Sequence, residues 1–361
     1  MSDAQILFDR AGSAGIITLN RPKALNALTL PMIRLMAPQM KDWAADDAVA
    51  VVVVRGAPRP DGRPAFCAGG DVRALWDERE DPTSTLAAEF FGEEYTLNRE
   101  IFRYAKPYVS LIDGVVMGGG VGLSAHGRWR VATENTLFAM PETAIGMLPD
   151  VGGTYILPRL PGLSGTYLAL TGARLKAADC LALGIATHFV PSAKLGELTE
   201  ALSQVTAGAG AGADAEVEAV LNRFSDAAAA GTPQITQHLP TINACFAGDD
   251  MAGILARLPV EGGEWGAGVA KELAHKSPTS MVIALRQMRI GGSLSFEDCM
   301  ITEFRVATRI VRTHDFGEGI RSVLVDKDHA PVWSPARVED VDPAAIDALF
   351  APLGNRDLHF D

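Results

Sequence analysis

The chain has 361 residues, a formal net charge of −12, 48% hydrophobic residues and 21% charged residues. This length suits one large domain or a domain with an appended one, and the composition is typical of a folded globular protein. Phosphate contacts depend on clustered Lys and Arg, so the acidic balance predicts no nucleic-acid partner. No apolar run approaches the roughly 20 residues that a membrane-spanning helix needs, so we expect no membrane partner.

The cysteines and histidines show none of the spacings that indicate a metal site. Four cysteines lie far apart without a CxxC pair, and the seven histidines form no HExxH or similar pattern. We therefore expect reduced thiols and no metal. The first residues carry acidic side chains and lack both an apolar signal core and an Arg-rich transit pattern, which predicts a cytoplasmic location.

The N-terminal half alternates short β-branched runs with helical stretches, a pattern typical of an α/β fold. Strands are expected at 15–20, 49–55, 108–113, 128–133 and 136–140. The second run is apolar without alternation, which predicts burial on both faces. Between the first two runs, apolar residues recur at helical spacing from Met32 to Trp43, so we expect a helix that packs in the core and is kinked at Pro38.

After about Pro191 the sequence becomes rich in Ala, Glu and Leu and predicts a mostly helical C-terminal region. We therefore divide the chain into a catalytic core, 1–200, and a helical region, 201–361. The small residues of 207–215 suit a flexible surface connection. A further helix is expected at 296–311, after the Gly291-Gly292 break.

Two glycine-rich turns each follow an expected strand and lead into an expected helix. In the first, 66–71, Gly70 lets a backbone N–H approach a ligand closely, although an ordinary turn between strand and helix would look the same. In the second, 113–123, N–H groups at a helix start favour negative charge. Two such donors on one oxygen would form an oxyanion hole. A nucleotide loop is the alternative, because Gly120, Gly122 and Ala125 fit the loose GxGxxA pattern.

The third segment, 140–154, holds two carboxylates in an otherwise apolar stretch. Apolar neighbours disfavour ionised groups unless these are paired or used, so Glu142 and Asp150 form a candidate acid/base pair. The alternative is structural, because Asp150 is also well placed to cap a helix that begins near Gly152.

With Asn-Arg-Pro-Lys-Ala-Leu-Asn-Ala-Leu at 20–28, these segments resemble the crotonase (enoyl-CoA hydratase/isomerase) superfamily over roughly 7–191. The resemblance implies an α/β fold built as a crotonase-like spiral of ββα units. It also implies CoA as part of the substrate, no separate cofactor, and the possibility of a homo-oligomer. By the same resemblance, the N–H groups of Gly70 and Gly119 form the oxyanion hole, and the residues around the CoA nucleotide are Lys23, Ala68 and Asp71.

The chain departs from the hydratases of this superfamily at one catalytic position. Hydratases carry a second glutamate where this chain has Gly122, whereas Glu142 is retained and Asp150 is added. This pattern resembles the 3-hydroxyisobutyryl-CoA hydrolase branch, as do the segments 90–95, 315–321 and 325–328.

The hydrolase resemblance implies cleavage of a short-chain hydroxyacyl-CoA thioester, 3-hydroxyisobutyryl-CoA in valine catabolism. Glu142 would activate water or attack the carbonyl, Asp150 would bind the 3-hydroxyl or orient water, and Glu94 would complete the acyl pocket. Two other functions remain open. One is an enoyl-CoA hydratase or isomerase that uses Glu142 alone, and the other is a catalytically silent protein that binds acyl-CoA.

Overall fold

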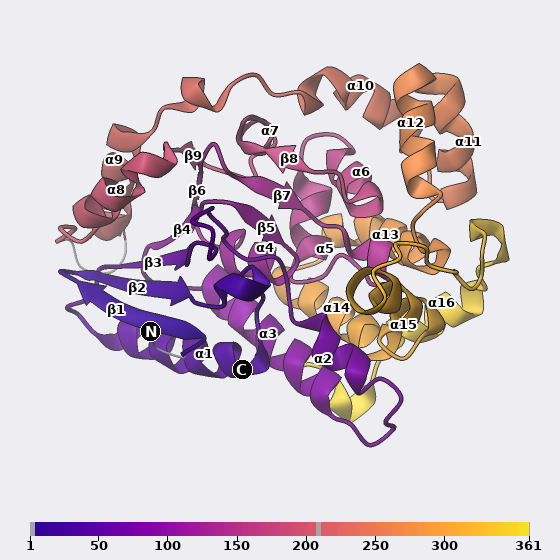
Figure 1. Ribbon diagram of the computed structural model, residues 1–361, viewed down its shortest axis with the longest axis horizontal. Helices are drawn as coiled ribbons and strands as arrows, with labels where there is room; N and C mark the ends of the chain where they lie inside the picture. Colours follow the sequence, from indigo (N-terminus) through magenta and orange to yellow (C-terminus); the bar gives the residue numbers. More distant parts are fainter. Residues whose placement is uncertain (1–3, 207–210, 361) are drawn as a thin grey trace. The chain divides into compact units, whose positions relative to one another are not determined.

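The structure, a computed structural model, describes residues 4–206 and 211–360 (Figure 1). The chain folds as two compact units that are interleaved in sequence. The first consists of Met1–Gly70, Thr96–Phe138 and Arg174–Thr236, and the second of Asp71–Tyr95, Ala139–Ala173 and Gln237–Asp361. These units differ from the expected division at residue 200, because two segments of the N-terminal half pack with the C-terminal helices.

The first unit contains a six-stranded sheet in which every neighbouring pair except the first is parallel. Its order is β1 (Ile6–Ala11), β2 (Ala14–Leu19), β3 (Val51–Gly56), β4 (Tyr108–Ile112), β6 (Trp129–Ala132) and β9 (His188–Phe189). Four of the expected strands are confirmed as β2, β3, β4 and β6. The sequence analysis did not predict β1, which pairs antiparallel with β2.

A second, three-stranded sheet has the order β5 (Val115–Met117), β7 (Leu137–Ala139) and β8 (Leu175–Lys176), and β7 confirms the fifth expected strand. The chain builds the two sheets alternately. β4 enters the large sheet, β5 enters the small one, and α4 (Gly119–Ser124) follows; β6 and β7 repeat the step before the 3-10 turn η2 (Glu142–Ile145). This repetition confirms the expected α/β fold of ββα units.

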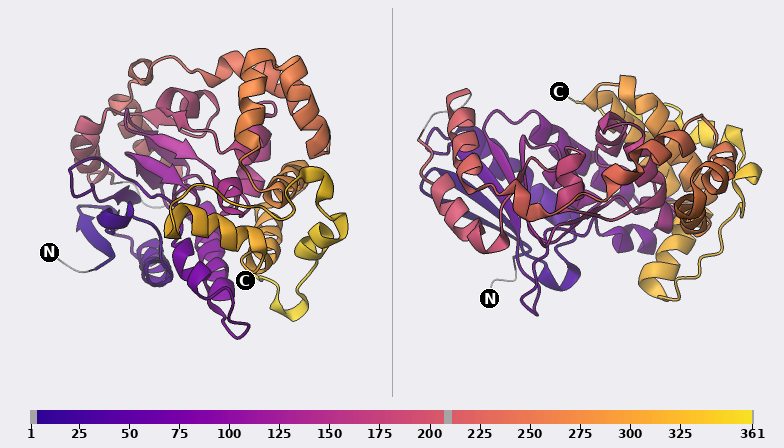
Figure 2. Two further views of the ribbon diagram at one scale, coloured as in Figure 1. Left: turned by 45° about the vertical axis from the view of Figure 1, so that its right-hand side comes forward. Right: turned by 90° about the horizontal axis from the view of Figure 1, so that it is seen from above.

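Helices cover both faces of the large sheet. Successive side chains of β2 point to opposite faces, so contacts of neighbouring residues show which helix covers each face. Ala14 and Ile16 pack in one apolar cluster with residues of α8 (Leu195–Leu202) and α9 (Ala211–Phe224). On the opposite face, α1 (Leu30–Ala45) places the Trp43 ring so close to Gly15 that a Cβ there would lie 2.6 Å from it. Because both faces are covered, the central valines of β3 are fully buried (Figures 1 and 2).

The helix expected from Met32 to Trp43 is confirmed as α1, with Pro38 inside it. The expected flexible connection at 207–215 is wrong in its second part. Residues 207–210 lie outside the described residues, whereas 211–215 begin α9. Asp214, in the first turn of α9, forms an ion pair with Arg128 and so ties this end of the helix to the chain beside β6.

The C-terminal region is helical, as expected. Helices of the second unit are α2 (Val72–Asp77), α5 (Gly153–Ile156), α6 (Ser164–Thr171), α11 (Met251–Glu261), α12 (Gly263–Leu273), α13 (Pro278–Ile290), α14 (Phe296–Ile310), α15 (His314–Ile320) and α16 (Pro343–Phe350). In this unit α5 contacts α13 and α14, while α15 contacts α2 and η2. α11 and α12 lie side by side (Figures 1 and 2). Among the described residues, no helix is both long and apolar enough to cross a membrane.

Three further helices complete the described chain. They are α7 (Ala177–Ala182) in the first unit, and α3 (Leu86–Phe102) and α10 (Ile235–Cys245), each of which contributes residues to both units.

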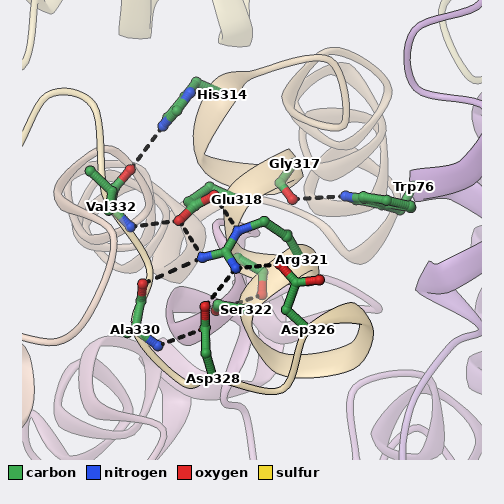
Figure 3. A network of polar contacts seen from close by, with 11 residues as sticks. Trp76, His314, Gly317, Glu318, Arg321, Ser322, Asp326, Asp328, Ala330 and Val332 are labelled. Carbon is green, nitrogen blue, oxygen red and sulfur yellow. Dashed lines mark hydrogen bonds and ion pairs between the residues drawn. The ribbon is translucent and has the colours of Figure 1, made fainter.

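The C-terminal motif singled out in the sequence forms a network around Arg321, at the start of a π-helical turn (Figure 3). The guanidinium of Arg321 donates to Glu318 at 2.8 Å and to Asp326 and Asp328 at 2.6 Å. Glu318 also accepts from the N–H of Val332 at 2.8 Å. The motif therefore holds the chain after α15 back against that helix, which is a structural role.

Candidate active site

The two glycine-rich turns lie side by side in the first unit because Cys67 pairs with β5. Its N–H donates to the carbonyl of Val115 at 2.9 Å, and its own carbonyl accepts from the N–H of Met117 at 3.0 Å. A Cβ at Gly120 would lie 2.3 Å from the Cys67 carbonyl oxygen. Glycine at position 120 is therefore what allows the helix start of the second turn to approach the first turn.

The two glycines expected to bind the acyl oxygen both have N–H groups available to a ligand. Gly119 begins α4 after Gly118, whose φ of +44° turns the chain into the helix. Gly70 forms an isolated parallel bridge with Leu28. Within the described part of the chain, neither Gly70 nor Gly119 donates its N–H to a protein acceptor. Two such donors are what an oxyanion hole requires.

The residues expected around the CoA nucleotide fall into two groups. Lys23 is exposed on the 3-10 turn η1 (Pro22–Ala24), and the next residues join the first glycine turn because Ala68 donates its N–H to the carbonyl of Leu25 at 3.0 Å. The structure thus brings the Lys23 loop and Ala68 together within the first unit. Asp71 is half-buried, precedes α2, and belongs to the second unit.

The three expected acids lie in one buried cluster of the second unit, together with a fourth acid that the sequence analysis missed. Glu94 comes from α3, Glu142 from η2, Asp150 from the turn before α5, and Glu303 from α14. None of the four is more than 7% exposed. Among the described residues, no group of three or more His, Cys, Asp or Glu side chains is arranged to hold a metal ion.

Hydrogen bonds divide the four acids into two kinds. Asp150 Oδ2 accepts from the Tyr95 hydroxyl at 2.8 Å, and Glu303 accepts backbone N–H groups through both oxygens. In contrast, Glu94 Oε1 and Glu142 Oε2 are buried without a hydrogen-bond partner among the described residues. A buried acceptor without a donor is costly unless a water or ligand supplies one, so these two oxygens are candidate contact points for a ligand or a water.

Comparison with known proteins identifies the family of the chain. The model of the enoyl-CoA hydratase/isomerase family matches residues 14–350. The chain belongs to this family. Among curated relatives, the mitochondrial 3-hydroxyisobutyryl-CoA hydrolases of Xenopus tropicalis and Homo sapiens are 46% and 44% identical to it, and each alignment covers 99% of this chain and 91% of the relative.

Solved structures of the enoyl-CoA hydratase/isomerase family agree with the fold. A carnitinyl-CoA dehydratase from Mycobacterium thermoresistibile is 38% identical with a TM-score of 0.88, and the match covers 99% of both chains. An enoyl-CoA hydratase from Rhodobacter sphaeroides 2.4.1 is 35% identical with a TM-score of 0.87, covering 99% of this chain and 100% of that one. The fold is therefore that of the family along nearly the whole chain.

The relatives overturn one expectation. The hydrolases from frogs, chicken and mammals that match this family member are named as mitochondrial proteins, which contradicts the cytoplasmic location predicted from the first residues. That prediction was wrong because it rested only on what the first residues lack, and the lack of a recognisable signal does not identify a compartment.

Burial raises the pKa of the acids in this cluster. Burial raises the pKa of Glu142 well above that of a free carboxyl, and the nearby Asp150 raises it further. Burial has the same effect on Glu94, again with Asp150 and then Glu303 as neighbouring charges. Burial also raises the pKa of Asp150, to about 6, although the Tyr95 hydrogen bond opposes this shift. The Tyr95 hydrogen bond is therefore the contact that favours the ionised form of Asp150.

Three side chains of the cluster region were not assigned a role from the sequence. Tyr95 lies inside a segment that carried the family resemblance, but its partner Asp150 is 55 positions away. Glu303 and Gln287 reach the same turn from the C-terminal helices. Glu303 could have been noticed from the sequence, because it is a polar residue within an apolar helical stripe. It lies among the buried residues Met300 and Phe304 of α14.

Proposed function

We propose that this protein hydrolyses a short-chain hydroxyacyl-CoA thioester, with 3-hydroxyisobutyryl-CoA as the substrate and 3-hydroxyisobutyrate and CoA as products. The observation that carries the proposal is the unpartnered, buried carboxylate oxygen of Glu142 in one cluster with Asp150, in a chain whose position 122 is glycine. The names of relatives that are 43–46% identical support the same substrate. This reaction would place the protein in valine catabolism.

The proposal gives the glycine turns the role of binding the thioester oxygen. The N–H groups of Gly70 and Gly119 would donate to that oxygen, which becomes negatively charged as the carbonyl carbon is attacked. Removing one donor of an oxyanion hole typically raises the barrier by about 3 kcal/mol, so two fixed donors would account for a large part of the acceleration. Lys23, Ala68 and Asp71 would contact the nucleotide part of CoA. The substrate supplies the CoA, and the proposed reaction uses no other cofactor.

Glu142 would supply the water by one of two routes. As a general base, its carboxylate takes a proton from water while the water oxygen bonds to the carbonyl carbon, and the CoA thiolate leaves and is then protonated. As a nucleophile, a carboxylate oxygen bonds to that carbon, the thiolate leaves, and water then cleaves the mixed anhydride. Either route needs ionised Glu142. Because its pKa is raised, the carboxylate is a stronger base once the proton is lost.

Asp150 and Glu94 would recognise the hydroxyl of the acyl group. The Tyr95 hydroxyl favours the ionised form of Asp150 by donating to Oδ2, and the other oxygen of the carboxylate would accept from the substrate. Glu94 Oε1, which has no hydrogen-bond partner among the described residues, can accept from the same hydroxyl. A site built to bind a hydroxyl disfavours an analogue without it, because its polar groups are left unpaired.

A second candidate function is hydration or isomerisation of an enoyl-CoA with Glu142 alone. Two structurally similar proteins, a carnitinyl-CoA dehydratase and an enoyl-CoA hydratase at 38% and 35% identity, favour it. Binding of acyl-CoA without turnover is the third outcome that an assay distinguishes.

Two assays run in parallel test the proposal. Purified protein is mixed with 3-hydroxyisobutyryl-CoA and a thiol reagent, and separately with crotonyl-CoA while the absorbance of the conjugated double bond is followed. We expect thiol release, its loss in Glu142→Gln, and normal release in Glu197→Gln, a control at an exposed glutamate of α8. Loss of crotonyl-CoA absorbance without thiol release would support the second candidate instead.

A single-turnover reaction in water enriched in oxygen-18 separates the two routes. With Glu142 as general base, the new carboxylate oxygen of the product carries the label. With an anhydride that water cleaves at the Glu142 carbonyl, the label stays on the protein and is found by mass spectrometry of the peptide containing Glu142. An anhydride cleaved at the acyl carbonyl instead labels the product, and trapping with hydroxylamine then reveals it.

A further inference from the structure

Glu303 is a buried carboxylate that the proposed mechanism does not use. It lies in the middle of α14 and is 0% exposed. Oε2 accepts the N–H of Gly152 and Oε1 accepts the N–H of Thr154, both at 2.8 Å. A side chain on a C-terminal helix thus holds two backbone groups of a turn about 150 positions earlier in the chain.

The turn that Glu303 holds is the one that follows Asp150. Val151 has φ +51° and Gly152 has φ +86°. A β-branched residue at positive φ is a genuine outlier, and such strained backbone typically costs about 1 to 3 kcal/mol, so it persists only where surrounding groups hold it. Hydrogen bonds to Glu303 on both sides of Gly153 supply that restraint.

A second C-terminal side chain holds the same turn from α13. The amide nitrogen of Gln287 donates to the carbonyl of Pro149 at 2.9 Å and to the hydroxyl of Thr154 at 2.7 Å. Gln287 is 0% exposed. Residues 149–154 are therefore fixed at both ends by side chains of α13 and α14, and Asp150 lies between the fixed ends.

We propose that Glu303, assisted by Gln287, is a positioning residue that holds Asp150 in the geometry needed to bind the substrate hydroxyl. The inference rests on the proposed function, because it assigns a purpose to the position of Asp150. Glu303 itself contacts no reacting atom. It acts through the backbone of the turn, which sets the direction of the Asp150 side chain toward Tyr95.

The position calls for a carboxylate rather than another polar group. The N–H groups of Gly152 and Thr154 bond to different oxygens of Glu303, so both oxygens must be acceptors. Glutamine would turn its NH2 group toward one of the two donors and leave that N–H without an acceptor. Aspartate has two acceptors but is one methylene shorter, so it reaches the turn only if α14 or the turn shifts.

The charge of Glu303 also acts on the other acids. Titratable groups that face it are Glu94 and Tyr95 from α3, Glu142 from η2, Asp150 from the turn and Cys299 from its own helix. Its charge raises the pKa of Glu142 and Glu94. Burial raises the pKa of Glu303 itself, to about 8, against the effect of its N–H bonds.

The chain offers a matched control for a carboxylate that holds two backbone N–H groups. Asp179 on α7 is 8% exposed, and its Oδ1 accepts from Gln234 and Ile235 at 2.6 and 2.8 Å. These donors lie at the start of α10, and Asp179 has no part in the acid cluster. Asp179→Asn therefore makes the same change from a buried acid to its amide at a place where no substrate group is expected, and its Oδ1 can still accept from both N–H groups.

The experiment compares thiol release from 3-hydroxyisobutyryl-CoA and from isobutyryl-CoA by the wild type, Glu303→Gln and Asp179→Asn. Misplacement of a reacting or binding group by about 1 Å can cost about 100-fold, so we expect kcat/KM of Glu303→Gln for the hydroxylated substrate to fall about 10- to 100-fold. Its kcat/KM for isobutyryl-CoA should change much less.

A merely structural role would give a different result. Asp179→Asn should leave the ratio of the two kcat/KM values unchanged. If folded Glu303→Gln also keeps the wild-type ratio, the inference is overturned. Where Glu303→Gln does not fold, Gln287→Leu serves as the second variant. We expect it to lower the preference for the hydroxylated substrate in the same direction. An unchanged preference would count against the inference.

Amide hydrogen exchange of the peptide that covers 149–156 supplies a readout that needs no turnover. We expect faster exchange there in Glu303→Gln than in the wild type or Asp179→Asn. Unchanged protection would overturn the inference whatever the substrate is. In contrast, absence of thiol release by the wild type would overturn only the proposed function, so the two failures are distinguishable.

Discussion

The hydroxyl of Tyr95 donates to Asp150 Oδ2 at 2.8 Å, and neither side chain is more than 7% exposed. Tyr95 therefore fixes one oxygen of this carboxylate. It also lowers the pKa of Asp150, against the larger effect of burial, which raises it. A tyrosine at this position thus keeps Asp150 ionised at a lower pH than burial alone would allow.

Replacing Tyr95 with phenylalanine should raise the pKa of Asp150 above about 6, because the hydrogen bond that stabilises the ionised form is lost. If ionised Asp150 binds the substrate hydroxyl, KM for the hydroxylated thioester should rise, and more steeply at pH 6 than at pH 8. The lost donor should also destabilise the protein by about 1 to 3 kcal/mol. Thiol release measured across pH and chemical denaturation test both effects.

Tyr104→Phe is the matched control for this change. The hydroxyl of Tyr104 donates to the Met40 carbonyl at 2.7 Å, outside the acid cluster. It should lower stability without altering the pH dependence of KM. The same pH dependence in both variants would contradict the role given to Tyr95.

Asp150→Asn should reduce the preference for a hydroxyacyl-CoA over the matching acyl-CoA. A hydrogen bond to a charged group contributes about 1.5 to 3 kcal/mol, so the ratio of the two kcat/KM values should fall roughly 10- to 100-fold. Parallel thiol assays on 3-hydroxyisobutyryl-CoA and isobutyryl-CoA measure it. An equal loss on both substrates would show that Asp150 acts on water or on the turn instead of on the hydroxyl.

The sequence predicted those parts of the fold whose signal is local. β-Branched runs identified β2, β3, β4, β6 and β7, and the apolar spacing from Met32 to Trp43 identified α1. It did not predict the interleaved units, since contacts of α5 and η2 with the C-terminal helices join segments more than 100 positions apart. Such long-range packing leaves no periodic pattern in either segment.

The difference between local signals and long-range packing also explains which site residues could be recognised from the sequence. Glu142 and Asp150 were recognisable because each is a carboxylate in an apolar stretch, and the structure shows both buried. Glu303 is a comparable anomaly, but its partners Gly152 and Thr154 could not be named without the structure. A polar residue in a helical apolar stripe indicates that a buried partner exists, and only the fold identifies that partner.

Gly120→Ala should disrupt the pairing of the two glycine turns. The added Cβ would lie 2.3 Å from the Cys67 carbonyl oxygen, so one of the turns must move. Overpacking of this kind typically costs about 1 to 3 kcal/mol, and displaced N–H groups would also lower kcat. Gly196→Ala on α8 is the control, because nothing lies within 4 Å of its added Cβ. Thermal unfolding and thiol release of the two variants should differ, and equal behaviour would show that the close approach is dispensable.

Arg321→Lys should lower the thermal midpoint although the charge is kept. The guanidinium holds both oxygens of Glu318 and one oxygen each of Asp326 and Asp328, and it can do so because its donors point in fixed, different directions (Figure 3). A lysine ammonium is a single point and cannot reach three carboxylates at once, so two of them would repel each other without a counterion.

Arg337→Lys is the control for this substitution, because Arg337 is 70% exposed and its contact with Glu339 is a simple surface pair. Circular dichroism melts in low and high salt compare the two variants. We expect a clear loss for Arg321→Lys at both salt concentrations and almost none for Arg337→Lys, since isolated exposed pairs contribute little. Thiol release at a temperature where both variants are folded should match the wild type, because the network supports the chain after α15 and takes no part in the chemistry. Loss of activity at full folding would show instead that the 315–328 motif shapes the active site.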